Sequence, residues 1–258
     1  SPLLYTLTAQ FDIIGRVPIF NPDTLHGEVI PKAIKPDFEA LTAVTVNGTN
    51  ELWIFGSGAK SPEREILVRA SVEPEGKVER WNLSPFFKSL KQQCKLSDAE
   101  LNIEAAVAVD DTMYLFNRGK NRVIWFSMNQ FEAFLLNASL SLNFNTTSFE
   151  LSEPGKPLIG FSGATYLPER EQVLFTASCE NTTNWIDDGE ILGSYLGILD
   201  LKSQQVLDLI PITENGKILP VKIESIAVQL TSKRKASVVM VCDQDGANSE
   251  LVWADLEF

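Results

Sequence analysis

The sequence repeats one short pattern four times, as Asp37-Phe-Glu-Ala-Leu, Asn102-Ile-Glu-Ala-Ala, Gly160-Phe-Ser-Gly-Ala and Lys222-Ile-Glu-Ser-Ile. When Glu39, Glu104, Ser162 and Glu224 are aligned, successive repeats lie 65, 58 and 62 residues apart. Each pattern leads, through an apolar stretch and a turn, to a short apolar run; the runs are Leu52-Trp-Ile-Phe, Met113-Tyr-Leu-Phe, Val173-Leu-Phe and Val238-Val-Met-Val. Such short runs are typical of strands buried on both faces. The spacing therefore predicts one supersecondary unit per repeat.

Each unit contains two further β-like stretches, such as Glu65-Ile-Leu-Val-Arg and Lys77-Val-Glu-Arg-Trp in the first. Four short strands per unit, with no helix between them, favour antiparallel sheets in a radial array, which is an all-β propeller. We therefore expect residues 1–258 to form a single β-propeller domain. Two helices decorate it, one capped by Ser84 and one opened by a capping box of Asn129 and Glu132.

The number of blades depends on the strand count. Two expected strands, Leu3–Phe11 and Asp12–Phe20, precede the first repeat, and the last repeat supplies three strands instead of four. The total of about 17 strands lies between the roughly 16 that four blades need and the roughly 20 that five blades need. We favour five blades with an incomplete N-terminal blade, and four or six blades are the alternatives.

Composition excludes several classes of function. The chain has 34 acidic and 22 basic residues and a net charge of −12, which disfavours nucleic acid and anionic membranes as partners. No apolar run approaches the roughly 18 residues of a membrane span. The single histidine, His26, has no nucleophile-elbow motif to serve, and Cys94, Cys179 and Cys242 fit no zinc spacing. Because three widely spaced cysteines are typical of reduced thiols, they favour a cytoplasmic location. We expect a monomer.

The motifs Lys35-Pro-Asp-Phe-Glu-Ala-Leu, Phe55-Gly-Ser-Gly, Leu101-Asn-Ile-Glu-Ala-Ala and Phe116-Asn-Arg-Gly carry a resemblance. They are similar to the signature of an uncharacterised bacterial β-propeller family, and the later repeats extend the match over nearly the whole chain. More distantly, the inner-strand glutamate resembles the motif of esterase-like phytase propellers. The resemblance implies the fold and no established activity.

Propeller geometry predicts where the polar residues of the repeat meet. The first strand of each blade lines the central channel, and the second strand returns beside it, so the start of one and the end of the other share a rim. This rule gathers Glu39, Glu104, Ser162 and Glu224 at one channel mouth. The ends of the second strands add Ser57, Asn117, Arg118, Ser178, Glu180, Asp243 and Asp245, and just upstream of the inner strands lie Lys35, Asp37, Asn102 and Lys222.

Three carboxylates that point into a narrow space repel one another unless something compensates. A hard cation such as Ca²⁺, internal pairing with basic side chains, or a shared proton would each compensate. We expect Glu39, Glu104 and Glu224 to be the metal ligands of such a site. The expected ligand-binding set is Glu39, Glu104, Glu224, Arg118, Asn117, Lys35 and Asp243.

Four interpretations stay open at this point. The repeated polar residues could serve blade-to-blade structure alone. The channel mouth could bind a cation or small polar ligand, it could support metal-assisted hydrolysis of phosphate esters or glycosides, or the propeller could be a scaffold for protein interaction. Further candidates for a cation or sugar, Asp187-Asp-Gly-Glu and Trp185, lie in one loop of the third repeat.

Overall fold

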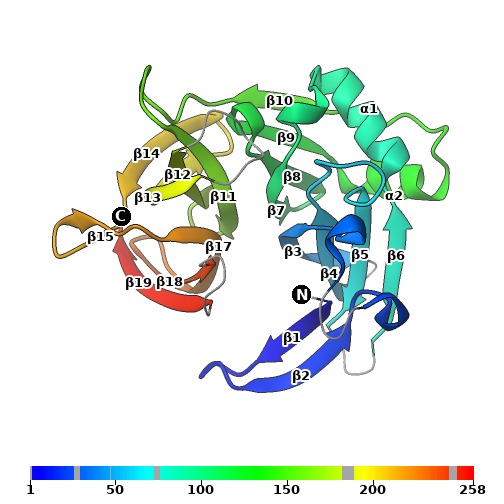
Figure 1. Cartoon of the computed structure of the whole chain (residues 1–258), viewed down its shortest axis with the longest axis horizontal. Coiled ribbons are helices and arrows are strands. Elements are labelled where there is room, and N and C mark those ends of the chain that lie inside the picture. The colour runs from blue at the N-terminus through cyan, green and yellow to red at the C-terminus, as the bar shows by residue number, and fades with distance from the viewer. Residues whose placement is uncertain (1, 26–29, 47, 73–75, 182–188, 244–248) are drawn as a thin grey trace.

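The computed structural model describes residues 2–25, 30–46, 48–72, 76–181, 189–243 and 249–258, and it contains four antiparallel sheets arranged in a ring (Figure 1). The first blade consists of β3 (Phe38–Val46), β4 (Thr49–Gly56), β5 (Ile66–Ser71) and β6 (Val78–Asn82). The second consists of β7 (Ile103–Val109), β8 (Thr112–Asn117), β9 (Arg122–Ser127) and β10 (Asn145–Ser148). The third consists of β11 (Leu158–Leu167), β12 (Gln172–Asn181), β13 (Glu190–Asp200) and β14 (Gln205–Pro211). The fourth has the three strands β17 (Lys222–Thr231), β18 (Lys235–Asp243) and β19 (Glu250–Glu257).

The prediction of an all-β propeller is confirmed, with four blades, which was an alternative to the favoured count of five. The two strands expected before the first repeat are β1 (Leu3–Leu7) and β2 (Ile13–Pro18), and they form a separate two-stranded sheet. In Figure 1 this hairpin lies between the first and the fourth blade. A smaller hairpin, β15 (Thr213–Glu214) with β16 (Lys217–Ile218), connects the third blade to the fourth.

The core is divided among the interfaces between blades. One apolar cluster lies between the first and second blades, a second between the second and third, and another between the third and fourth. A small cluster of Ile19, Ile54 and Val68, with Leu4 against it, joins the β1–β2 hairpin to the outer face of the first blade. The second and third sheets are thus covered by a neighbouring blade on both faces, which explains why their second strands read as continuous apolar runs, whereas the first and fourth sheets have a neighbouring blade on one face.

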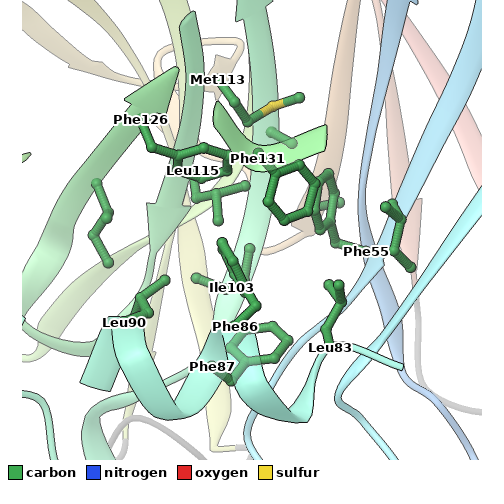
Figure 2. Packing of buried hydrophobic residues seen from close by; sticks show 14 of the residues in the cluster. Phe55, Leu83, Phe86, Phe87, Leu90, Ile103, Met113, Leu115, Phe126 and Phe131 are labelled. Atoms are coloured by element: carbon green, nitrogen blue, oxygen red, sulfur yellow. The ribbon is translucent and has the colours of Figure 1, made fainter. Parts of the chain in front are cut away.

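Two helices close the first and second blades at their outer side, as the sequence predicted. They are α1 (Ser84–Cys94) and α2 (Met128–Leu136). Phe86 of α1 is fully buried, and its ring packs edge-on against Phe126 and Phe131 (Figure 2). The expected caps were wrong. Ser84 is already inside α1, and α2 is capped by Ser127, whose hydroxyl accepts a hydrogen bond from the Gln130 backbone.

Short 3-10 turns occupy Pro22–Thr24, Lys32–Ile34, Asp98–Glu100 and Gly119–Asn121. The three cysteines are free thiols and are buried. Within the described residues, none of the helices has the length and apolar character needed to cross a membrane.

Candidate functional site

All four aligned positions of the repeat are β-bulges in the innermost strands. In β3 the pairing with β4 passes from Phe38 to Ala40, so Glu39 is the extra residue. The corresponding extra residues of β7, β11 and β17 are Glu104, Ser162 and Glu224. A bulge inserts one residue into one strand and re-aims its side chain. The repeat therefore marks one structurally equivalent position per blade.

A cavity of about 730 Å³ lies among the four inner strands, and three of these bulged residues line it. Glu39, Glu104 and Glu224 are the only charged side chains among its lining residues in the described part of the chain. Small and apolar side chains make up most of the remaining wall, including Ala106 and Ala164. The cavity therefore combines a group of carboxylates with an apolar interior.

Two of the three cavity carboxyls, those of Glu39 and Glu104, have a raised pKa. Burial raises the pKa of Glu39 well above its ordinary range, and the neighbouring charges of Glu104, Asp37 and Glu224 raise it further. Burial also raises the pKa of Glu104 to about 7, although Arg118 and Lys222 act in the opposite direction. Glu104 accepts a hydrogen bond of 2.7 Å from the Asn102 amide. At neutral pH the group is therefore poised to exchange a proton for another cation.

The fourth bulge has no charge. Ser162 is 1% exposed, and its hydroxyl donates to Thr176 Oγ1 over 3.2 Å. The bulged residue is thus acidic in the first, second and fourth blades and neutral in the third blade.

Arg118 forms a buried ion pair with Glu180 of the third blade. Its Nη2 lies 2.7 Å from Glu180 Oε1, and its Nη1 donates to Ser178 Oγ over 2.7 Å. The side chain is buried and crosses Gly160, where an added Cβ would lie 2.7 Å from Arg118 Cγ. Gly160 is therefore needed at this repeat position because the arginine occupies the space of a side chain.

Lys222 links this pair to the acidic bulges. Its Nζ lies 3.3 Å from Glu224 Oε1 and 3.6 Å from Glu180 Oε1. Burial alone would lower the pKa of Lys222, but Glu180, Glu224 and Glu104 raise it above its ordinary value. For the acid Glu180 the effects have the opposite sign: burial alone would raise its pKa, but the charges of Arg118 and Lys222 bring the pKa below its ordinary value. Glu180 is therefore a stable carboxylate, whereas burial raises the pKa of Glu39 and Glu104.

Lys35 is directed to Asp37 at the first blade. Its Nζ lies 3.1 Å from Asp37 Oδ1, and Arg64 Nη1 lies 2.5 Å from Asp37 Oδ2. Asp37 has a φ of 53°, a left-handed conformation in which its backbone carbonyl also accepts from Ser57 N. Arg64, which the sequence did not single out, is thus the second cation of this group.

Asn117 stabilises the turn after β8 through the hydrogen bonds of its side-chain amide. It is fully buried, its Oδ1 accepts from Asn102 N, and its Nδ2 donates to the carbonyls of Glu100 and Gly119 over 2.9 and 2.7 Å. These contacts occupy its polar atoms within the second blade. Asn121 acts similarly between blades, since its amide donates to Ile159 O and accepts from Phe161 N.

Several expected site residues lie outside the described part. Asp243 ends β18, but its side chain is outside the described residues, as are Asp245, Trp185 and the first two residues of Asp187-Asp-Gly-Glu. In the described residues, no group of three or more acidic, histidine or cysteine side chains is arranged to hold a metal ion. The assignment of Glu39, Glu104 and Glu224 as metal ligands stays a prediction.

A family model described as "Family of unknown function (DUF6929)" matches residues 1–256. A search of curated proteins gives no match. Among solved structures, hydrazine synthase of Kuenenia stuttgartiensis aligns with a TM-score of 0.42 and 11% identity, over 90% of this chain and 49% of that one. Glutaminyl cyclase of Myxococcus xanthus aligns with a TM-score of 0.39 and 10% identity, over 81% of this chain and 62% of that one. This chain thus spans about half to two thirds of their length. Similarity to phytase propellers stays a prediction.

Proposed function

Since the chain belongs to this family of unknown function, we propose from the site itself that the protein is a binding module whose channel takes up a cationic group in exchange for a proton. One observation carries the proposal: the only charged side chains lining the cavity, within the described residues, are Glu39, Glu104 and Glu224. The nearby cations Arg118, Lys35 and Lys222 do not line it. A cationic ligand would lower the pKa of Glu39 and Glu104, which burial and the neighbouring carboxylates raise.

The chemistry of the wall favours an organic cation with an apolar body. A lone Ca²⁺ requires six to eight oxygen ligands, which an apolar wall does not supply. An alkylammonium group can place its charge at the glutamates and its methylene groups against residues such as Leu41 and Val107. Pockets that bind small molecules are commonly apolar with a few convergent polar groups of this kind.

Calorimetric titration with n-butylammonium at pH 6 and pH 8 tests the proposal. Binding should be tighter at pH 8, and the heat should depend on the ionisation enthalpy of the buffer, because uptake releases protons. Glu104→Gln should weaken binding, whereas Glu169→Gln, in the exposed turn between β11 and β12, should leave it unchanged. A parallel titration with CaCl₂ tests a metal as the cation. Absence of heat with both cations, or binding that is indifferent to pH and to Glu104→Gln, would refute the proposal.

A second candidate, hydrolysis of phosphate esters or glycosides, is supported by the pKa of Glu104 at about 7. A carboxyl that titrates near neutral pH is suited to general acid or base catalysis. Chromogenic phosphate esters and glycosides, assayed with and without divalent metal ions, test this candidate. Turnover that is lost in Glu104→Gln and retained in Glu169→Gln would favour it over binding alone.

A further inference from the structure

The glutamates occupy one end of the central cavity, and most of its length lies beyond them. The charges of Glu104 and Glu224 raise the pKa of Glu39, so the three carboxyls lie close together, near the starts of their inner strands. The lining continues along β3 from Glu39 to Ala43 and along β17 from Glu224 to Val228. At about 3.3 Å for each residue of a strand, the wall extends roughly 13 Å past the glutamates.

This longer part of the cavity is open because its wall is made of small side chains. Ala43, Ala106, Ala164 and Ala227 come from β3, β7, β11 and β17, the four strands that surround the channel (Figure 1). Among the lining residues that the structure describes, the polar side chains beyond the glutamates are uncharged hydroxyls of serine, threonine and tyrosine. A second ammonium group in this part would lose its water without gaining a counter-ion.

Part of the wall is apolar surface that the fold leaves exposed. Leu41 is 48% exposed although it belongs to the innermost strand of the first blade, and Ala43 and Ala227 are exposed as well. All three line the cavity. A hydrocarbon group that removes such surface from water gains free energy in proportion to the area it covers. The wall therefore favours a ligand with an apolar tail.

We propose that the cation taken up by the channel is a single ammonium group on an unbranched alkyl tail of about eight to ten carbons. The ammonium group lies among the three glutamates, and the tail runs along the inner strands past Leu41 and Ala227. An extended chain gains about 1.2 Å for each single bond, so roughly ten bonds span the wall. The inference rests on the proposed function, because it names the class of cation that the same site binds.

The size of the cavity agrees with such a ligand. Its volume of about 730 Å³ lies within the range of about 300–1,000 Å³ that is usual for small-molecule sites. A charged group at one end and an apolar wall along the rest match the two parts of an alkylammonium ion.

Calorimetric titration of the full chain at pH 8 with n-butyl-, n-hexyl-, n-octyl- and n-decylammonium tests the length of the tail. The concentrations stay below those at which the ions aggregate. Each added methylene should tighten binding about three- to fourfold until the wall is covered. The total gain from n-butyl to n-decyl should be at least about a hundredfold. n-Decanoate, which has a similar tail and a negative charge, should bind far more weakly because the carboxylates repel it.

A matched pair of ligands tests the preference for one charge. n-Heptylammonium and 1,6-diaminohexane have the same number of heavy atoms, and they differ in the group at the far end. The diamine should bind at least about tenfold more weakly, because its second ammonium group would lie against the apolar wall.

A matched pair of protein variants locates the tail. Ala227 lies three residues beyond Glu224, about 10 Å along β17, and it is exposed, so Ala227→Phe places a ring in the channel. This variant should bind n-butylammonium like the parent and lose the gain from longer tails. Ala99→Phe, at an exposed alanine of the turn Asp98–Glu100, should match the parent over the whole series. If Ala227→Phe fails to fold, Ala43→Phe replaces it from β3.

The outcomes separate this inference from the proposed function. If n-butylammonium binds through Glu104 and longer tails gain nothing, or if the gain persists in Ala227→Phe, the tail site is refuted and cation binding stands. A diamine that binds as tightly as n-heptylammonium would also refute the inference alone. If n-decanoate binds as tightly as n-decylammonium and Glu104→Gln has no effect, the cavity is an apolar site without charge recognition, and both proposals are refuted. Absence of binding by the whole series would refute both as well.

Discussion

Replacement of Glu104 by glutamine should stabilise the protein above neutral pH. The pKa of Glu104 is about 7 in the folded chain, against an ordinary value of 4.5. Between these values the folded state retains a proton that the unfolded chain has released, so the carboxyl costs stability as the pH rises from 4.5 to 7. The full cost, reached above pH 7, is about 3 kcal/mol at 1.36 kcal/mol for each pH unit. Glutamine avoids this cost because it has no proton to lose.

Urea denaturation at pH 5 and pH 8 measures this difference. At pH 5, parent and Glu104→Gln should differ in free energy of unfolding by less than about 1 kcal/mol, since pH 5 lies only half a unit above the ordinary pKa of a glutamate. At pH 8 the variant should be more stable by up to about 3 kcal/mol. Glutamine can still accept the 2.7 Å hydrogen bond from the Asn102 amide, so the packing of the bulge is preserved. Glu169→Gln, at an exposed turn, is the control and should change little at either pH.

The opposite outcome would refute the reasoning. If Glu104→Gln is less stable than the parent at pH 8, the carboxylate is compensated by Arg118 and Lys222, and the electrostatic basis of the proposed site is lost. If Glu104→Gln changed the free energy of unfolding by the same amount at both pH values, the reasoning would also be contradicted, because such a change would come from packing and not from ionisation.

Other predictions follow from the contacts around the site and are measured by urea denaturation at pH 7. Arg118→Met should cost about 3–5 kcal/mol because it leaves Glu180 buried without its closest cation, and a loss under 1 kcal/mol would contradict this. Asn117→Ala should cost about 2–3 kcal/mol through the buried carbonyls and amide it leaves without a partner, whereas exposed Asn137→Ala should be nearly neutral. Phe86→Ala should cost about 3–5 kcal/mol by opening a cavity among the aromatic rings of Figure 2, and retention of parent stability would show that the cluster collapses around it.

The repeat was sufficient to predict the propeller, because every blade contains an apolar run in its second strand, in β4, β8, β12 and β18, with at least one face buried against the neighbouring blade. The number of blades was not predictable from strand counting. The β1–β2 hairpin and the three-stranded fourth blade together supply five strands, and the sequence does not say whether these form one sheet or two. The strand pairing of the folded chain, in which β1 pairs with β2 and β17, β18 and β19 pair with one another, assigns the hairpin to a separate sheet.

The sequence predicted the positions of the site residues better than it predicted which residues they contact. Alignment identified Glu39, Glu104 and Glu224 as equivalent, but the bulge that makes them equivalent depends on strand register. The sequence also predicted Arg118 at the rim. It did not reveal that Arg118 crosses Gly160 to pair with Glu180, since that contact joins residues 62 apart in two different blades.

The contrast between Ser162 and the three glutamates bears on whether the acids serve the fold alone. All four residues occupy the same bulge, and Ser162 satisfies it with a hydroxyl hydrogen bond and no charge. The geometry of the bulge therefore does not require a carboxylate. At Glu104 the carboxylate also has a cost, because burial raises its pKa and so lowers the stability of the folded chain at neutral pH. Proteins depart from the most stable choice of residue chiefly at functional or strained sites. Burial raises the pKa of two of the three acids, Glu39 and Glu104, and the fourth position shows that a neutral residue can fill the bulge, which supports a role for the glutamates in binding a cationic group.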